Sequence, residues 1–258
     1  MADIFSEIAS IPHFYCIRAA ESKLISHYIS TFNVPSLDLG CGDGMFGCSL
    51  NLEDNHGLDH DASSIERARR RGGYRTVTLG EASLIPFGDQ TFSLVVSNCA
   101  IEHMDDLDSV LAEVCRVART GCQFIFTVLT PRYFDLIDDD SAIASLCLKT
   151  AEIISLYNLH HHHVNIFNLQ TWVDKLTNVG FRVRKFHYYL PGRIGRFVAR
   201  MDILYTVNSQ QSRDMVVRLE AAFRSIRSLI FRTELNAYLS CPWRIDGGTH
   251  LLIDAVKI

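Results

Sequence analysis

Apolar and polar positions follow two different rhythms along the first half of the chain. Short apolar runs without a period predict buried strands, and apolar residues that recur every three or four positions predict helices that bury one face. The predicted strands cover residues 34–39, 55–58, 74–79, 92–97 and 122–129. The predicted helices cover residues 45–52, 62–71 and 105–118. Because strands and helices alternate, the pattern predicts an α/β protein whose parallel sheet has helices on both faces.

Helical patterns dominate the two ends of the chain. Residues 1–32 predict a helical segment that Pro12 interrupts. Further on, helices are predicted over 138–159 and 168–178, and strands over 181–190 and 251–258. A long helical insertion lies between these two strands, and its apolar stripe needs a surface to pack against. The stripe consists of Met215, Leu219, Ala222, Phe223, Ile226, Leu229 and Ile230.

Composition and charge narrow the class of protein. The chain has 258 residues, of which 48% are hydrophobic and 21% charged, as in soluble globular proteins. No apolar run reaches the ~20 residues that span a bilayer. The first ten residues lack the basic and then apolar layout of a signal peptide, so we expect a cytoplasmic protein. Its eight cysteines form no CxxC pair, so we expect reduced thiols and no structural zinc.

The charge is unevenly distributed along the chain. The net charge is −4, yet the stretch from Arg182 to Arg232 holds eleven Lys and Arg residues against three acids, a local excess of eight. This asymmetry indicates an acidic or anionic partner for the C-terminal part. A solvated helix face explains it equally well, and the sequence leaves both interpretations open.

A glycine cluster is the strongest chemical signal. A predicted strand is followed by three closely spaced glycines and then by a helix, at Gly40, Gly42 and Gly44. This order describes a nucleotide-binding turn, in which the backbone approaches the ligand closely. The dinucleotide fingerprint needs its third glycine where Met45 stands. Asp38 and Asp43 would repel a pyrophosphate and attract an ammonium and a sulfonium, so the loop favours S-adenosylmethionine over NAD.

A second signal follows the second predicted strand. Asp59 stands 19 residues after Gly40, where an acid can accept hydrogen bonds from both ribose hydroxyls. NAD sites share this feature, so it does not discriminate between the two cofactors. Asp61, two residues further on, is expected to cap the helix over 62–71.

Four segments in this order resemble class I S-adenosylmethionine-dependent methyltransferases. The segments are DLGCGDG, GLDHD, GEASLIPFGDQTFSLVVSN and AIEHMDDLDSVLAEVCRV. They are most similar to the ubiquinone/menaquinone-biosynthesis-like (type 11) group of small-molecule methyltransferases. The resemblance covers residues 34–130 and, more loosely, 164–190. It implies an active enzyme with a doubly wound, seven-stranded, mostly parallel sheet, in which 181–190 and 251–258 form the final pair and one strand is antiparallel.

The resemblance also implies a domain organisation. Residues 1–33 would form an N-terminal helical lid over the cofactor. Residues 34–190 and 244–258 would form the methyltransferase core. Residues 191–243 would be a helical insertion that covers the acceptor pocket.

Cofactor-binding roles are carried over from the same resemblance. Asp38 and the backbone of the glycine loop would hold the methionine portion, and Asp59 the ribose. Glu81, where the family often has Asp, would accept from the adenine amino group. The backbones of Ala82 and Asn98 would pair with the ring and the methionine amine, and Arg18 would pair either with the cofactor carboxylate or with Glu21. The candidates are Arg18, Asp38, Gly40, Cys41, Gly42, Asp59, His60, Glu81, Ala82 and Asn98.

Histidines are the candidates for a catalytic base. Methyl transfer is an in-line displacement that depends mainly on alignment, but an oxygen or carbon nucleophile also needs a base near neutral pKa. One residue at most is expected to serve, among His103, His160, His161, His162 and His163. Each of them has a packing or surface role as its alternative. We expect no metal site, because consecutive histidines point in different directions and no companion carboxylate is identifiable.

The acceptor class is only partly constrained. Nucleic acid is not expected, since the fourth strand is followed by Ser97-Asn98-Cys99-Ala100 rather than by an Asn/Asp-Pro-Pro-aromatic motif, and the chain is acidic overall. The basic insertion favours an anionic, lipid-linked or sugar-type metabolite, with peripheral membrane contact, and a homodimer is the competing interpretation. A non-catalytic methyltransferase-like binding protein and a NAD-linked oxidoreductase remain as alternative functions.

Overall fold

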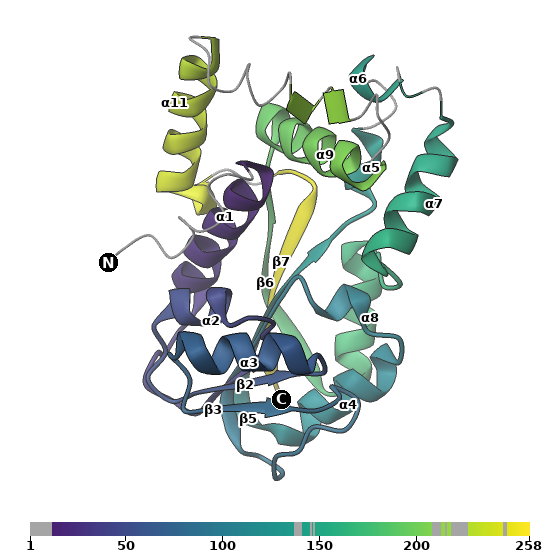
Figure 1. Ribbon diagram of the computed structural model, residues 1–258. Helices are drawn as coiled ribbons and strands as arrows, with labels where there is room; N and C mark the ends of the chain where they lie inside the picture. Colours follow the sequence, from purple (N-terminus) through teal and green to yellow (C-terminus); the bar gives the residue numbers. More distant parts are fainter. Residues whose placement is uncertain are drawn as a thin grey trace.

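A seven-stranded sheet forms the centre of the molecule in the computed structural model (Figure 1). The structure describes residues 12–136, 141–144, 146, 148–207, 213–214, 216–217, 227–244 and 247–258. The strand order is β3-β2-β1-β4-β5-β7-β6. The strands are β1 (Ser36–Leu39), β2 (Asn55–Asp59), β3 (Thr76–Leu79), β4 (Phe92–Asn98), β5 (Ala118–Leu129), β6 (Phe181–Tyr189) and β7 (His250–Lys257).

Helices flank the sheet and extend beyond one end of it. In the first half these are α1 (Pro12–Tyr28), α2 (Met45–Leu50), α3 (Ala62–Arg71), the short helix η2 (Ile101–His103) and α4 (Leu107–Val117). The second half adds α5 (Arg132–Asp135), α6 (Ser141–Ala144), α7 (Thr150–His161), α8 (Leu169–Asn178), α9 (Gly192–Val207), α11 (Arg227–Ser240) and η3 (Pro242–Arg244). The predicted doubly wound α/β fold is confirmed.

The sheet is parallel except for β7. β1 pairs in parallel with β2 on one side and with β4 on the other. β7 runs antiparallel to both β5 and β6 and lies between them. The predicted final strand pair is therefore confirmed, with the antiparallel strand one position inside the sheet edge. Strand order reverses between β1 and β4, and in sheets of this kind ligands bind outside the carboxyl ends of the strands at that point.

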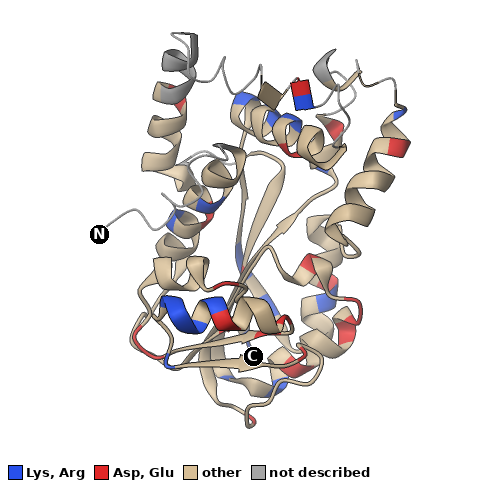
Figure 2. Cartoon of the chain, in the orientation of Figure 1, with Lys and Arg blue, Asp and Glu red and all other residues tan. Residues whose placement is uncertain are grey.

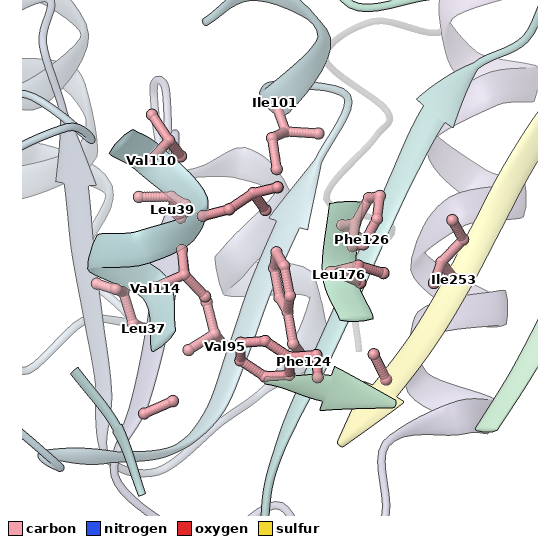
Figure 3. Packing of buried hydrophobic residues seen from close by; sticks show 14 of the residues in the cluster. Leu37, Leu39, Val95, Ile101, Val110, Val114, Phe124, Phe126, Leu176 and Ile253 are labelled. Atoms are coloured by element: carbon pink, nitrogen blue, oxygen red, sulfur yellow. The ribbon is translucent and has the colours of Figure 1, made fainter. Parts of the chain in front are cut away.

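Alternating side chains of the central strands fill two separate cores. Successive residues of a strand point to opposite faces of the sheet. On one face Leu37 and Leu39 of β1 and Phe124 and Phe126 of β5 pack with buried residues of α4 and α8 (Figure 3). The residues labelled there are Leu37, Leu39, Val95, Ile101, Val110, Val114, Phe124, Phe126, Leu176 and Ile253.

The opposite face of the sheet is covered by α1, α2, α9 and α11. Leu94 and Val96 of β4 and Ile125 of β5 point to this side and pack with Leu24 and Ile25 of α1. The residues on α9 and α11 that join this core are separated from β4 by about a hundred positions in the sequence, for example Ile194 and Leu235. The N-terminal helix is thereby held against both the sheet and the helical insertion.

Two predicted element boundaries are wrong. The helix predicted over 138–159 is divided, because α6 ends at Ala144 and α7 begins only at Thr150. The backbone N–H of Lys149 donates to the Glu152 carboxylate at 2.8 Å, which satisfies a free donor at the start of α7. β5 begins at Ala118 instead of 122, because Ala118 pairs with Phe92 across an irregular register.

The helical insertion is described only in part. The residues of its predicted apolar stripe, together with Arg218 and Arg224, lie outside the described residues or have side chains that do. Within the described part, Lys and Arg gather on α9 and on α3 (Figure 2). None of the described helices combines the length and the hydropathy that a membrane span requires.

Candidate functional site

A cavity of about 940 Å³ opens at the carboxyl ends of β1, β2 and β4. Its wall is formed by the glycine loop after β1, the end of β2, residues 80–83 after β3, residues 98–100 and 103–106 at and after the end of β4, and α1. The volume is near the upper end of the ~300–1,000 Å³ of small-molecule sites. The cavity therefore lies at the point of strand reversal where the fold class places its ligands.

The glycine loop follows β1 and leads into α2. Gly40 has φ +74°, and a Cβ there would lie 2.5 Å from that of Ala100, so the loop can approach the segment after β4 only without a side chain. Gly42 has φ +53°, and a Cβ on it would meet no described atom within 4 Å. Its backbone therefore borders open space that a ligand can fill. The side chain of Cys41 is buried, while its backbone contributes to the cavity wall.

Asp38 is buried at the end of β1. The residue is 2% exposed and is absent from the cavity lining formed by the described residues. Its carboxylate accepts a hydrogen bond of 2.6 Å from the Tyr74 hydroxyl. Burial raises the pKa of Asp38 to about 6, while the Tyr74 hydrogen bond acts to lower it and the nearby Asp59 acts to raise it. Asp38 is therefore buried behind the glycine loop, and its contact with the methionine portion of the cofactor stays a prediction.

Asp59 joins the glycine loop to the end of β2. Its Oδ2 accepts from the Gly42 backbone N–H at 2.8 Å, and its Oδ1 accepts from the Asp61 N–H at 2.9 Å. Its side chain is 10% exposed, and it lines the cavity together with the exposed His60. Each carboxylate oxygen retains a second lone pair that can accept from a ribose hydroxyl. Asp61 caps α3, as predicted, with its side chain accepting from the Ser64 N–H at 2.9 Å.

The segment after β3 forms the outer part of the cavity wall. The Gly80 backbone N–H donates to the Asp59 carbonyl at 2.9 Å, which holds this segment beside the end of β2. Glu81 and Ala82 line the cavity; Glu81 is exposed, whereas Ala82 packs partly against the core. The arrangement leaves the Glu81 carboxylate available to an amino group, and the Ala82 backbone beside it.

A buried carboxylate on α1 organises the opposite wall. Glu21 is fully buried and accepts hydrogen bonds from Arg18 at 2.8 Å, Asn98 at 3.0 Å, Cys99 at 2.9 Å and Tyr189 at 2.8 Å. Burial acts to raise the pKa of Glu21, but Arg18 and the hydrogen bonds hold it below its ordinary value. The sequence left open whether Arg18 pairs with Glu21 or with a ligand. The Glu21 pair forms, and Arg18 also lines the cavity.

Asn98 is held so that its backbone borders the cavity. Its side-chain nitrogen donates to Glu21, and its side-chain oxygen accepts from the Thr127 hydroxyl at 2.8 Å. Both polar ends of the side chain are therefore occupied within the protein. Cys99, the next residue, has φ +45°, an uncommon backbone conformation for a residue other than glycine. Strained residues of this kind gather at functional sites.

The five candidate histidines occupy different environments. His103 and His162 line the cavity, and His162 also contacts Asp105 at 2.9 Å. His160 is exposed and His161 contacts the Thr206 hydroxyl at 2.9 Å; neither belongs to the described cavity lining. His163 lies behind His103, with ring centroids 4.6 Å apart. Burial lowers the pKa of His103, and it lowers that of His163 to about 3, so both rings are neutral at physiological pH.

The electrostatic character of the cavity is negative. Among the described residues that line it are five carboxylates and one guanidinium, that of Arg18. The carboxylates belong to Asp43, Asp59, Glu81, Asp105 and Asp106. A surface of this sign attracts cations and disfavours a pyrophosphate.

Several residues of the cavity wall were not predicted from the sequence. Phe14 of α1 lines the cavity although it is more than one third exposed, and Cys99, Met104 and Asp105 line it after β4. Their position just beyond a strand end was the available signal, because ligands bind at the carboxyl ends of such strands. Tyr189, which holds Glu21, carries no comparable signal, since it lies on β6, far along the chain from the glycine loop.

A family model described as a methyltransferase domain matches residues 37–126. Malonyl-[acyl-carrier protein] O-methyltransferase from Hamiltonella defensa is 36% identical over 95 residues, which are 36% of this chain and 37% of that protein. Fatty-acid O-methyltransferase from Mycolicibacterium smegmatis is 28% identical over 148 residues, 54% of each protein. The chain thus spans about 37–46% of the length of the first malonyl-[acyl-carrier protein] relatives.

Solved structures show the same architecture over most of the chain. An S-adenosylmethionine-dependent methyltransferase from Mesorhizobium loti is similar with a TM-score of 0.57 and 18% identity, over 92% of this chain and 98% of that one. Geranyl diphosphate C-methyltransferase from Streptomyces coelicolor, solved with S-adenosyl-L-homocysteine, has a TM-score of 0.58 and 14% identity, over 93% and 80%. Residues 37–126 therefore match the methyltransferase domain family, and the fold built around them is the one that these solved S-adenosylmethionine-dependent methyltransferases share.

Proposed function

We propose that this protein is an S-adenosylmethionine-dependent O-methyltransferase that esterifies a carboxylate carried on an acyl chain. The observation that carries the methyltransferase part is the wall of the cavity, where the open backbone at Gly42 and the Asp59 and Glu81 carboxylates stand along one side. The acyl carboxylate part is supported by the two kinds of relatives, whose names give malonyl-[acyl-carrier protein] and fatty acids as acceptors.

The residues present fit S-adenosylmethionine better than a dinucleotide. Asp59 would accept from the ribose, Glu81 from the adenine amino group, and the loop backbone with Arg18 and Asn98 would surround the methionine end. The excess of carboxylates along the wall suits the sulfonium and ammonium charges of this cofactor and opposes the pyrophosphate of NAD. The bound cofactor would supply an electrophilic methyl group, and the protein's part is to align the acceptor with it and to exclude water.

A carboxylate acceptor changes what the histidines need to do. Carboxyl groups have ordinary pKa values near ~4, so the acceptor is already ionised at neutral pH and requires no general base. His103 and His162 line the cavity, where they would position the acceptor and would not need to take a proton from it. The predicted catalytic base would be required only for a hydroxyl or carbon acceptor, which has to lose a proton.

The acceptor can be identified by measuring release of S-adenosyl-L-homocysteine. The purified chain is incubated with S-adenosylmethionine and with a medium-chain fatty acid, malonyl-[acyl-carrier protein], or the matching alcohol. We expect turnover with at least one carboxylate and none with the alcohol. Turnover of the carboxylate should fall less than tenfold in His162→Ala, since general-base loss costs roughly 10²–10⁴-fold.

Two results would contradict the proposal at different levels. Tight binding of S-adenosylmethionine in calorimetry without turnover of either carboxylate would overturn the acceptor class and retain the cofactor. No binding of S-adenosylmethionine, or binding of NAD in its place, would overturn the methyltransferase function itself. The expected cytoplasmic location, the anionic or membrane-associated acceptor of the basic insertion and the homodimer stay predictions, as do the domain boundaries at 33, 190 and 243.

A further inference from the structure

Three potential metal ligands meet beside the cavity. Glu102 and His103 belong to η2, directly after β4, and His163 follows α7. One ligand atom from each of the three side chains lies within 4.8 Å of the other two. The sequence offered no carboxylate as companion to the histidine run, because Glu102 is about sixty positions away. Tertiary structure brings the two segments together.

Backbone and side-chain hydrogen bonds hold these two segments in place. The Glu102 carbonyl accepts from the backbone N–H groups of Val164 and Asn165, each at 3.0 Å. The buried Asn165 side chain donates to the carbonyls of Ile101 and Met104, at 3.1 and 2.6 Å. These hydrogen bonds hold η2 and the segment after α7 against each other next to Glu102, His103 and His163. A metal site requires rigid support of this kind.

Each of the three side chains keeps a buried polar atom without a partner. The atoms are Glu102 Oε2, His103 Nδ1 and His163 Nδ1, and none of them has a hydrogen-bond partner among the described residues. Glu102 is only 1% exposed. A buried polar atom without a partner is destabilising, so three at one point indicate a common partner that the described residues do not supply.

The hydrogen bonds of the His103 ring indicate that this partner is a cation. The backbone at His161 and His162 hydrogen-bonds the His103 ring, while Nδ1 has no partner in the described part of the chain. A neutral imidazole has a single N–H, so a ring that donates to backbone carbonyls through its other nitrogen presents a lone pair at Nδ1. Metal-binding histidines are oriented in this way, by a backbone carbonyl on the nitrogen that faces away from the ion.

We propose that Glu102, His103 and His163 bind one divalent first-row transition ion of the zinc type at the edge of the cavity. Two imidazole nitrogens and one carboxylate suit zinc and its neighbours, whereas magnesium and calcium prefer sites built from oxygen atoms. The His103 and His163 rings are stacked, with an angle of 20° between their planes. Ion binding therefore turns the His163 ring about χ2, which is a broad torsion for histidine, and draws the ligand atoms to bonds of about 2.0–2.2 Å.

Such an ion would have a free coordination position. Three protein ligands leave the fourth position of a tetrahedral ion open to water or to an oxygen of another molecule. His103 also lines the cavity, so the site adjoins the space in which an acceptor would be held. If the proposed function holds, the open position can take an oxygen of the acceptor carboxylate and keep it beside the methyl donor.

Zinc binding to the intact, chelator-treated chain tests this site directly. We expect one equivalent of Zn²⁺ in calorimetry, and visible absorption of four-coordinate Co²⁺ when cobalt replaces it. His163→Ala and Glu102→Gln should each weaken Zn²⁺ binding at least tenfold. The matched control is His160→Ala, which removes an exposed histidine from the same run and should leave binding unchanged. Circular dichroism establishes that each variant is folded.

Three outcomes would overturn the site. The first is an absence of Zn²⁺ binding, which would leave a bridging water as the partner of the three atoms. The second is binding that His163→Ala leaves unchanged and His160→Ala abolishes, which would locate the ion on the exposed histidines. The third is a Co²⁺ spectrum of a fully hydrated ion. S-adenosylmethionine affinity is measured on the same samples, so failure of the metal site is distinguishable from failure of the proposed function.

Discussion

Individual carboxylates in this molecule have different roles that burial and neighbours decide. Asp59 keeps lone pairs directed at the cavity, whereas Asp38 is buried against Tyr74 and Asp61 caps α3. All three stand within or just after adjacent parallel strands, in segments that resemble cofactor motifs. Their partners, and not their residue type, therefore determine which of them can contact a ligand.

Replacing Asp59 by Ala should weaken S-adenosylmethionine binding by about 1–3 kcal/mol, the usual cost of losing hydrogen bonds to a charged group. The measurement is isothermal titration calorimetry on the purified variant. Glu66→Ala is the control, since Glu66 is an exposed acid on the neighbouring helix α3. Equal affinity in Asp59→Ala and the wild type would remove Asp59 from the cofactor site.

At the scale of secondary-structure elements, α1 depends on one buried network. Glu21 connects this helix to the end of β4 through Asn98 and Cys99, and to the end of β6 through Tyr189. α1 also packs against α9 and α11 on the same face of the sheet. The helix that carries Arg18 and Phe14 to the cavity is consequently held in place by contacts far from it in sequence.

Glu21→Gln should loosen this helix and weaken cofactor binding together. The neutral amide loses the ion pair with Arg18, which is partly exposed, so we expect a loss of about 2 kcal/mol in the free energy of unfolding. Affinity for S-adenosylmethionine should fall severalfold, because Arg18 and Asn98 lose their common acceptor. Urea denaturation and calorimetry give the two values.

Lys175→Gln provides the matched control for the loss of an ion pair. Lys175 of α8 pairs with the exposed Asp108 at 2.7 Å. Exposed ion pairs contribute only ~0.2–1 kcal/mol to the free energy of unfolding. Cofactor affinity should be unchanged in that variant. If Glu21→Gln lowered stability and left cofactor affinity intact, Glu21 would be a structural residue only.

At the scale of the whole molecule, the packing on both faces of the sheet holds a carboxylate in a buried position. Both faces of the central strands are filled by fully buried side chains such as Leu37, Phe124 and Ile125. That packing keeps Asp38 in place beside Tyr74, although a buried carboxylate opposes its own ionisation. The stability of the molecule is therefore expected to depend on the protonation of this group.

The free energy of unfolding should respond to pH through Asp38. Its pKa rises from 3.8 to about 6 on folding, so the folded state favours the protonated form. The contribution of Asp38 to the free energy of unfolding is fully present below pH ~4 and is lost as the pH rises through about 6. The two limits differ by about 3 kcal/mol. Asp38→Asn should remove this pH dependence. The free energy of unfolding of the wild type minus that of the variant should therefore fall by the same amount between pH 4 and pH 7.

Urea denaturation at several pH values measures this difference. Glu53→Gln serves as the control, since Glu53 is exposed and should leave the pH profile unchanged. Parallel profiles for the wild type and Asp38→Asn would show that Asp38 ionises normally in the folded protein.

The sequence alone determined the elements and the location of the site. Strand and helix periods, the glycines at 40, 42 and 44, and the capping Asp61 act within a few residues, and local patterns of this kind can be interpreted without the fold. The parallel sheet followed from the same alternation, and its final pair of strands from a family resemblance. These features depend on backbone geometry and nearest neighbours, which the chain carries with it.

Only tertiary structure decided which side chains share a site. Asp38 meets Tyr74, Glu21 meets Asn98 and Tyr189, and Glu102 meets His163, across 36 to 168 positions of sequence. No local period encodes such pairs, because they depend on which strand ends and helix faces the sheet brings together. Hydrogen bonding and burial then decide which polar groups face the cavity and which are buried, which is why the sequence located the cavity and missed the cluster of Glu102, His103 and His163 beside it.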